Sequence, residues 1–593
     1  MTVPSASVPD KQHAVSIAAF FLPFALVPWL NPFAGGAMTP GIPLLVGWTC
    51  TAFLFAGQPA KYLPRSAAVM LGALVLAVLC GVALDRSWQL LAAALLMMGA
   101  AALVSMSLVQ EFAPLSAAVG ALEPGRAGAA AQQGVAQKGI SFIAWSWLLA
   151  GLINALIGVL QYRQQTAWLG QWVNHAPVGQ IYGNLRQRNQ FASLLCMALW
   201  ALWYLWQQGW LAQLLRRFFP APQGVVTVLA WLLMLPLSAM MAFTSSRTGL
   251  LQLAAMVMLL AFWRLRRQQG TGAGTSRAQV IAWLLGVALV YAATSYLLPH
   301  LLGGVDMLAR LEGTDSRACI SRKVLWSNVL QLIAQKPWWG WGWGELDYAH
   351  YYANYSGMRF CSLLDHAHNL PLQLAVELGI PLALALCGLC LWWVLRNRPW
   401  AETNPARQLM WGVLVVMAVH SMVEYPLWYA HFQLACGLAL GVLWSTARSR
   451  RASAVYTGAT ARYLQGALAG CLLLGMAYAS FDFARVTQLY MAVEDRIWPF
   501  RNKTREQAER SLLYRNAVQF ASVSLDPVTL EQAEQQLAIA RRLMHYSPES
   551  RMVIRIIECL RVLERHAEAD AEAEHFKQVY PAEYARWHAD AEK

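Results

Sequence analysis

The sequence predicts an all-α, polytopic integral membrane protein with about 13 transmembrane helices, a large extramembrane loop and a C-terminal soluble helical domain. The composition is the first reason, because 58% of the 593 residues are apolar and only 13% are charged, with a mean hydropathy of +0.39. A soluble globular protein carries about twice that share of charged residues. The second reason is the recurrence of apolar runs close to the roughly 20 residues that a bilayer core requires. Third, several runs begin or end in Trp or Tyr, as is typical of membrane–water interfaces.

The expected spans follow directly from these apolar runs. They lie near residues 14–30, 40–56, 66–84, 88–109, 140–160, 189–210, 224–243, 249–263, 278–298, 370–395, 408–430, 432–447 and 462–480.

The distribution of Lys and Arg predicts the orientation. With the N-terminus inside, the cytoplasmic loops contain most of the basic residues, as the positive-inside rule requires. The short outer loops contain only Arg86, Arg163, Arg186, Arg188 and Arg247. The net charge of +14 is therefore mainly a topology signal, and we expect no nucleic-acid partner.

This orientation predicts the domain organisation. Residues 1–480 would form a transmembrane core whose large outer loop covers about 299–369, and residues 481–593 would form an outer helical domain. Within that domain, apolar residues recur at three-to-four spacing in 528–545 and 549–567, on either side of Pro548. This pattern predicts a pair of antiparallel helices.

The cysteines and glycines of the outer loop indicate no cofactor. Cys319 and Cys361 both lie in that loop, and in an oxidising compartment they could form a disulfide. No Cys/His cluster has zinc-ligand spacing, and no Asp-rich motif suggests a divalent cation. Gly340, Gly342 and Gly344 alternate with Trp and are not followed by a P-loop lysine, so they do not predict a nucleotide site.

A histidine-rich stretch marks the most distinctive position of the chain. Asp365-His366-Ala367-His368-Asn369 lies where the polar outer loop meets an apolar span, and Glu377 and Gly379 follow. Neutral imidazole is well suited to act as a general base near pH 7. The stretch therefore indicates chemistry at a membrane face, although a helix-capping or interfacial histidine is the alternative. We expect Asn369 and Glu377 to orient the histidine or the loop.

Three arginine-containing motifs face the same side. They are Gly183–Gln190, which contains Arg186, Gln187, Arg188 and Asn189; the turn Thr244–Gly249, which contains Arg247; and an amphipathic segment that begins at Arg322. A single arginine there is often an interfacial anchor, because its side chain can extend toward water. However, outer-face arginines run against the positive-inside bias, and guanidinium groups bind phosphate oxygens bidentately. Several of them together would bind a diphosphate without a metal.

A further ionisable cluster, His420, Glu424 and Tyr425, lies near the outer end of the 408–430 span. Such groups usually face the interior of a helix bundle. His420 and Glu424 are four residues apart and share a helix face. They could be a satisfied structural pair or could brace the reaction centre.

Together these motifs resemble those of the O-antigen ligase/polymerase superfamily of membrane glycosyltransferases. Within it the chain is most similar to bacterial protein O-oligosaccharyltransferases of the pilin-glycosylation type. The resemblance covers nearly the whole chain and also includes Trp326, the segment Pro337–Gly344 and the helical C-terminal extension. Arg188 departs from the pattern, because many relatives are expected to have proline there, and this leaves the role of that motif open.

The resemblance implies an enzyme of the bacterial inner membrane with its active site on the periplasmic face. The donor would be a glycan on undecaprenyl diphosphate, and the acceptor a Ser or Thr hydroxyl of a periplasmic or pilin-like protein. His368 matches the essential loop histidine, whereas His366 is expected to support it. Arg247 and Arg322 match the residues assigned to the diphosphate, and we add Arg186 and Arg188 to them. The reaction is expected to be inverting, independent of metal and without a cofactor.

Two other functions remain open. The same chemistry would serve an O-antigen ligase, which transfers glycan to lipid A core, or an O-antigen polymerase. The Gly183–Gln190 motif and the C-terminal extension favour a protein acceptor. A transporter of lipid-linked glycans is less favoured, because it should show broken mid-membrane helices or an internal repeat, and the sequence indicates neither.

Overall fold

The computed structural model describes residues 11–34, 41–57, 62–80, 86–111, 126–266, 277–302, 318–446 and 455–591. Residues 303–317 of the predicted outer loop and 81–84 of one predicted span lie outside the described residues. The described chain is almost entirely helical. Its two short strands, β1 (Tyr62–Pro64) and β2 (Val455–Thr457), pair antiparallel with Tyr62 opposite Thr457.

The chain divides into two compact units. The first contains residues 1–79, 90–313 and 393–476, and the second contains residues 80–89, 314–392 and 477–593. The divisions fall inside or next to long helices, so the same helix can begin in one unit and end in the other.

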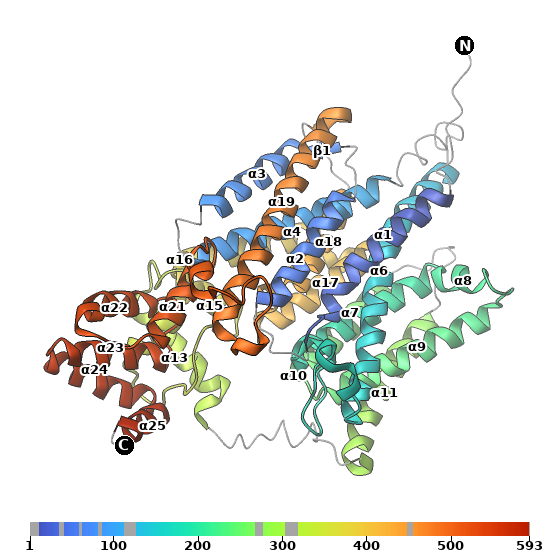
Figure 1. The fold of residues 1–593 in the computed structure, drawn as a ribbon. Coiled ribbons are helices and arrows are strands. Elements are labelled where there is room, and N and C mark those ends of the chain that lie inside the picture. The colour runs from blue at the N-terminus through green and yellow to red at the C-terminus, as the bar shows by residue number, and fades with distance from the viewer. Residues whose placement is uncertain are drawn as a thin grey trace. The chain divides into compact units, whose positions relative to one another are not determined.

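The first unit is built from long apolar helices (Figure 1). They are α1 (Lys11–Leu30), α2 (Gly41–Ala56), α3 (Arg65–Cys80), α4 (Arg86–Glu111), α6 (Arg126–Tyr162), α7 (Arg188–Gln207), α8 (Trp210–Leu215), α9 (Gln223–Phe243), α10 (Arg247–Arg266), α11 (Arg277–Leu302), α17 (Pro405–Ser421), α18 (Ala430–Ser445) and α19 (Gly458–Thr487). Short 3₁₀ turns are η1 (Ala167–Trp172), η2 (Gly183–Leu185), η4 (Pro399–Ala401) and η5 (Pro426–Trp428). Helix α7 is central, because seventeen of its twenty residues are buried and it packs against α6, α9, α10 and α17.

The helix lengths confirm a membrane protein of the helical class. Among the described residues, six helices are long and apolar enough to cross a membrane. They are Ser87–Val109, Gly139–Tyr162, Gln223–Phe243, Arg277–Leu297, Ile380–Ala401 and Gly458–Tyr490. Four more apolar helices are shorter, and the number of thirteen spans stays a prediction.

Two predicted spans have the wrong bounds. The span at 370–395 is interrupted, because α15 (Leu370–Leu378) ends at Gly379 and α16 (Ile380–Asn397) begins after it. The span at 408–430 is too long, because α17 ends at Ser421. Pro426 follows in η5, and a proline has no N–H with which to continue a helix.

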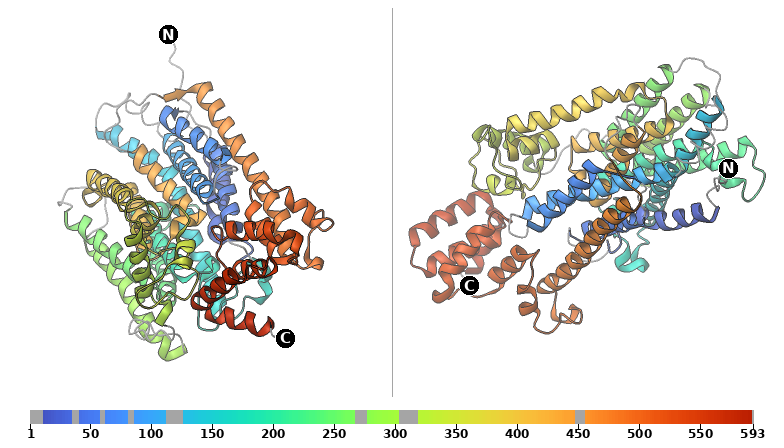
Figure 2. Two further views of the ribbon diagram at one scale, coloured as in Figure 1. Left: turned by 90° about the vertical axis from the view of Figure 1, so that its left-hand side faces the viewer. Right: turned by 90° about the horizontal axis from the view of Figure 1, so that it is seen from above.

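The second unit combines the outer-loop residues with the C-terminal helices. From the loop come η3 (Ala318–Ile320), α13 (Arg322–Gln335), α14 (Leu346–Tyr352) and α15. From the C-terminal segment come η6 (Gln488–Tyr490), η7 (Val493–Asp495), α20 (Thr504–Glu509), α21 (Arg515–Leu525), α22 (Leu530–Leu543), α23 (Ser550–Val562), α24 (His566–Val579) and α25 (Pro581–Ala591). The predicted helix pair around Pro548 is confirmed as α22 and α23, which lie side by side (Figure 2).

The outer loop and the C-terminal helices share one apolar core. Tyr351 of α14 is only 1% exposed and packs among Leu537, Ile556 and Phe576 of the C-terminal helices. The Tyr351 hydroxyl also donates a hydrogen bond to Glu572 Oε1 at 3.1 Å. Burying large side chains of this kind contributes on the order of 2 kcal/mol each. Helix α14 is therefore held firmly by the C-terminal helices.

A disulfide closes the loop on itself. Cys319 and Cys361 are bonded, with their Cα atoms 5.5 Å apart. The pairing that the sequence left open is therefore formed in the structure, and it ties the region before α13 to the segment before the histidine-rich stretch.

Candidate functional site

The histidine-rich stretch forms a tight turn directly before α15. His368 has a positive φ of 50°, a conformation that is uncommon for a residue with a side chain. Asn369 is the N-cap of α15, and its Oδ1 accepts a hydrogen bond from the Leu372 N–H at 3.0 Å. The helix-capping role is thus filled by Asn369, as its type favours, which removes that alternative for His368. The half-buried imidazole of His368 sits in the turn itself.

The turn is held on both sides of Ala367, which is fully buried. Its N–H donates to Gln373 Oε1 at 2.6 Å, and its carbonyl oxygen accepts from Trp326 Nε1 at 3.0 Å. The Nδ1 of the neighbouring His366 contacts the carbonyl oxygen of Asp365. The bonds of Ala367 thus hold the backbone between the two histidines in place.

Helix α13 joins Arg322 to this turn. Ser321 caps the helix by accepting from the Val324 N–H at 3.4 Å, and Arg322 is its first residue. Trp326, which bonds to Ala367, lies one helical turn further along. Leu325 of α13 and Ala367 also belong to the same apolar cluster. The elements that carry Arg322 and His368 are thus packed and hydrogen-bonded together within one unit.

Glu377 holds the glycine-rich segment Pro337–Gly344 rather than the histidine. Its side-chain Oε1 accepts from the Gly344 N–H at 2.9 Å, and its backbone oxygen accepts from the Gly342 N–H at 3.0 Å. The carboxyl group is 2% exposed, and burial raises its pKa from an ordinary 4.5 to about 8. The neighbouring carboxylates of Asp347 and Glu345 act in the same direction.

This shift predicts an unusual pH dependence of stability. Between pH 4.5 and 8 the folded protein keeps a proton on Glu377 that the unfolded chain releases, so the contribution of Glu377 to stability should fall as pH rises through this window. Burial raises the pKa of Asp347 to about 7 with the same sign, so Asp347 still contributes part of the slope between pH 7 and 8, where Glu377 contributes the larger part. There Glu377→Gln should remove the share of Glu377, which is at most about 1.4 kcal/mol of unfolding free energy per pH unit, so its Tm should decrease less steeply with pH than the Tm of wild type.

The measurement is thermal unfolding of the purified protein in detergent at closely spaced pH values. Glutamine keeps an oxygen that can accept from the Gly344 N–H, so the fold should persist. Glu531→Gln, at an exposed position of α22, is the matched control and should keep the wild-type slope. An unchanged slope in Glu377→Gln would show that this carboxyl group titrates normally.

The first unit brings a second group of predicted residues together. Asn189 links two of the motifs, because its Nδ2 donates to Glu424 Oε1 at 3.1 Å and its Oδ1 accepts from the Ser246 hydroxyl at 2.7 Å. Arg247 follows Ser246 directly and begins α10, with an exposed side chain. One turn further along α7, the Ser193 hydroxyl is 2.9 Å from His420 Nδ1. The side chains of His420 and Glu424 thus both hydrogen-bond to α7.

Tyr425 and the arginines of the Gly183–Gln190 motif have separate surroundings. Tyr425 stacks on Tyr429 with ring centroids 5.8 Å apart. Arg188 donates to Gln180 Oε1 at 2.9 Å and lies over the Tyr182 ring. Arg186 is exposed, with a φ of 59°. Gln187 occupies the N-cap position of α7 without capping it through its side chain.

Several polar residues that support these groups were not predicted. Gln252 donates to Ser193 Oγ at 2.7 Å and to the Val416 carbonyl at 3.1 Å. The Asn184 backbone N–H donates a hydrogen bond to Asn154 Oδ1 at 2.7 Å, which fixes the backbone of the Gly183–Gln190 motif. The signal that could have identified Ser193, Gln252 and Asn154 is their position inside apolar spans, where polar side chains usually face the bundle interior.

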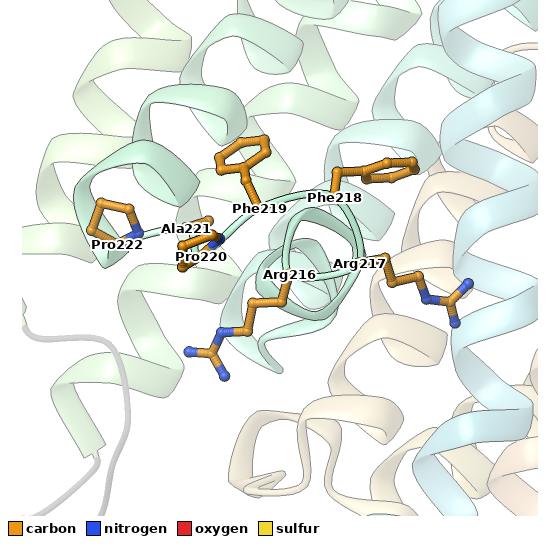
Figure 3. A pocket seen from close by; sticks show the side chains of 7 residues that line it. All are labelled: Arg216, Arg217, Phe218, Phe219, Pro220, Ala221 and Pro222. Carbon is orange, nitrogen blue, oxygen red and sulfur yellow. The ribbon is translucent and has the colours of Figure 1, made fainter.

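A separate hollow of the surface lies between α8 and α9. It is lined by consecutive residues from Arg216 to Pro222, with the two arginine side chains extending in different directions (Figure 3). The predicted orientation places this loop inside, away from the outer-face motifs.

No group of three or more His, Cys, Asp or Glu that could hold a metal ion occurs among the described residues. A reaction without a metal stays a prediction.

Comparisons with known proteins agree with the resemblance seen in the motifs. Residues 229–387 match a family model described as O-antigen ligase, residues 181–206 match protein glycosylation ligase, and residues 408–593 match the C-terminal part of virulence factor membrane-bound polymerase. The histidine-rich stretch, Arg247 and Arg322 lie within the O-antigen ligase match, and Gly183–Gln190 lies within the glycosylation ligase match.

Two curated relatives from Acinetobacter baylyi are similar to the chain. A general O-oligosaccharyltransferase is 24% identical over 58% of this chain and 57% of its own length. A ComP-specific O-oligosaccharyltransferase is 24% identical over 59% of each. The match thus spans less than two thirds of either relative. The resemblance is nonetheless confirmed: the chain is similar to the O-antigen ligase family and, within it, to bacterial protein O-oligosaccharyltransferases.

Proposed function

We propose that the protein transfers an oligosaccharide en bloc from undecaprenyl diphosphate to Ser or Thr hydroxyls of periplasmic or pilin-like proteins. The reaction would occur at the periplasmic face of the bacterial inner membrane. The observation that carries the proposal is the hydrogen bond from Trp326 to the carbonyl oxygen of Ala367. This bond joins the turn that contains the His368 imidazole to the helix that begins with the Arg322 guanidinium group. The proposed transfer uses the first as a base and the second to bind the diphosphate.

In this mechanism His368 is the general base. Its imidazole takes the proton of the acceptor hydroxyl as the oxygen attacks the anomeric carbon. The bond from that carbon to the diphosphate oxygen breaks, and undecaprenyl diphosphate leaves with the electron pair. A single displacement inverts the anomeric carbon. General-base assistance of this kind is worth roughly 10²–10⁴ in rate.

The arginines would stabilise the leaving group. Negative charge develops on the diphosphate, and fixed guanidinium groups in a partly dry site offset it effectively. We assign this role to Arg322, Arg247, Arg186 and Arg188. Asn189, His420, Glu424 and Tyr425 would brace the helix ends around Arg247, an assignment supported by the bonds of Asn189 to Ser246 and Glu424.

The comparisons favour a protein acceptor. The match to protein glycosylation ligase falls on the Gly183–Gln190 motif, and the two curated relatives are named as O-oligosaccharyltransferases. A second candidate is O-antigen ligation or polymerisation. It is supported by the O-antigen ligase match over residues 229–387 and the membrane-bound polymerase match over residues 408–593.

Reconstituted transfer distinguishes these functions. Purified protein, a lipid-diphosphate-linked glycan and a pilin-like acceptor should yield acceptor whose mass increases by one complete glycan. Addition of EDTA should leave the rate unchanged, because the proposed diphosphate site uses guanidinium groups. Glycan found only on lipid A core would identify a ligase, and lengthened lipid-linked glycan a polymerase. Loss of activity with EDTA, restored by a divalent cation, would contradict the metal-free site.

A further inference from the structure

A groove lined by aromatic side chains lies within the second unit, apart from the residues assigned above. It has a volume of about 330 Å³. Its lining residues are Trp88, Lys336, Trp341, Gly342, Trp343, Glu345, Tyr348 and His545. Ligand pockets are typically of about this size or larger, and they combine aromatic walls with a few placed polar groups.

The aromatic walls are held in place by specific contacts. Trp88 and Trp343 lie with ring centroids 6.0 Å apart, and the Trp343 indole N–H donates to the Ser87 carbonyl at 3.2 Å. The Tyr348 ring stacks on His545 at 3.8 Å. Trp88 nevertheless remains 47% exposed, so a large aromatic surface is open to a ligand.

The polar groups of the groove provide both donors and acceptors. The Lys336 ammonium lies 3.9 Å from the centre of the Trp341 ring. Glu345 Oε2 is 2.7 Å from His545 Nδ1, and its other carboxylate oxygen can accept a further bond. The mixed charges do not favour a free anion such as phosphate, because the carboxylate would repel it.

This combination fits a sugar ring. A pyranose has a face of C–H groups, which pack on the electron-rich face of an aromatic ring, and an edge of hydroxyl groups that both donate and accept. The groove offers Trp and Tyr rings for the first and an ammonium, a carboxylate and an imidazole for the second. An interfacial tryptophan alone would need none of these polar partners.

The groove and the histidine turn lie at opposite ends of α15. The backbone N–H of Trp341 donates to the Val376 carbonyl at 2.9 Å, and the backbone N–H groups of Gly342 and Gly344 donate to Glu377. The groove therefore adjoins the C-terminal end of α15. His368 precedes the N-terminal end of the same helix. The eight residue-to-residue steps from Asn369 to Glu377 span about 12 Å of helix, a length that a few linked sugar rings cover.

We infer that this groove binds a sugar ring of the oligosaccharide beyond the one that is attached to the diphosphate. The inference rests on the proposed function for its substrate, and it adds a subsite that selects the donor by its glycan rather than by its lipid. A subsite at this distance would bind donors that carry several sugars more tightly than a donor that carries one.

Calorimetric binding to the full-length protein in detergent tests the groove without transfer chemistry. The probe is the free oligosaccharide that mild acid releases from the donor, which carries neither lipid nor phosphate. Trp88→Ala should weaken its binding by about fivefold to tenfold, and Trp88→Phe should restore part of that loss. Trp339→Ala is the matched control, because Trp339 is 88% exposed and lies outside the groove. Thermal unfolding of each variant reports on folding.

Kinetics provide the second measurement. With the full-length glycan donor, Trp88→Ala should raise KM by the same factor and leave kcat unchanged. With a donor that carries a single sugar, KM should not change. Equal oligosaccharide affinity in wild type and Trp88→Ala overturns the subsite. So does an effect on the KM of the acceptor protein alone, which would identify an acceptor-docking site.

The two proposals fail in different ways. If wild type transfers no glycan but binds the free oligosaccharide through Trp88, the groove stands and the transferase assignment falls. If transfer proceeds and every Trp88 variant binds the oligosaccharide as wild type does, the transferase assignment stands and the groove falls.

Discussion

Replacing His368 with alanine should lower the rate of glycan transfer by about 10²–10⁴, the usual contribution of a general base. The acceptor hydroxyl would then have to attack while it still carries its proton. The fold should tolerate the change, because the imidazole is only half-buried and hydrogen bonds at Ala367 and Asn369 hold the turn.

Initial rates with saturating donor and acceptor measure this effect, and membrane insertion is checked by the yield of purified protein and its Tm. His175→Ala is the matched control, because His175 lies in the other predicted outer loop and bonds to Thr166 at 2.7 Å. It should transfer glycan at the wild-type rate. His366→Ala should lose less activity than His368→Ala. Wild-type transfer by His368→Ala would exclude His368 as the base.

The position of the histidine turn could be predicted from the sequence because its signals are local. Asn369 followed by Pro371 and an apolar run is a typical helix start. The packing of this turn against α13 could not be predicted, because the bond from Trp326 to Ala367 joins residues 41 positions apart. Local patterns do not specify which distant carbonyl an indole N–H will reach.

The same limit explains the cluster around His420. Spacing of four residues predicted that His420 and Glu424 share a helix face, but α17 ends at Ser421 and Glu424 lies beyond it. Ser193 and Asn189 of α7, more than 220 residues earlier, also hydrogen-bond to them. Helix packing decides these partners, and periodicity within one helix carries no information about its neighbour.

Hydropathy also misplaced the start of the span after the histidine turn. Residues 370–395 have the hydropathy of one continuous span, because a single glycine hardly changes a hydropathy average over so many residues. In the structure Gly379 has φ 84° and ψ 159°, a conformation that is essentially restricted to glycine. It divides the run into a short helix that belongs to the site and a longer one that can cross the membrane.

Gly379→Ala should therefore have an effect nearly as large as the loss of His368. A Cβ atom at this position would lie 2.2 Å from the Trp338 carbonyl oxygen, closer than any real contact, and backbone atoms cannot rotate away. The disallowed conformation adds about 1–3 kcal/mol. Relief of the clash must shift α15 against the segment Pro337–Gly344, and a displacement of about 1 Å at the catalytic group can cost roughly 10²-fold in rate.

Gly357→Ala separates the effect of backbone strain from the effect of the steric clash. Gly357 also has a positive φ, 124°, but an added Cβ would meet nothing within 4 Å. This variant should show backbone strain alone, with a modest decrease in Tm and near-normal transfer. Gly379→Ala should lose both stability and transfer, measured by thermal unfolding and by initial rates. Equal losses in the two variants would mean that conformational strain, and not the close approach of Trp338, sets the requirement for glycine. A loss of transfer in Gly379→Ala without a matching loss in Gly357→Ala would instead show that the position of α15, at whose N-terminal end His368 lies, controls the rate.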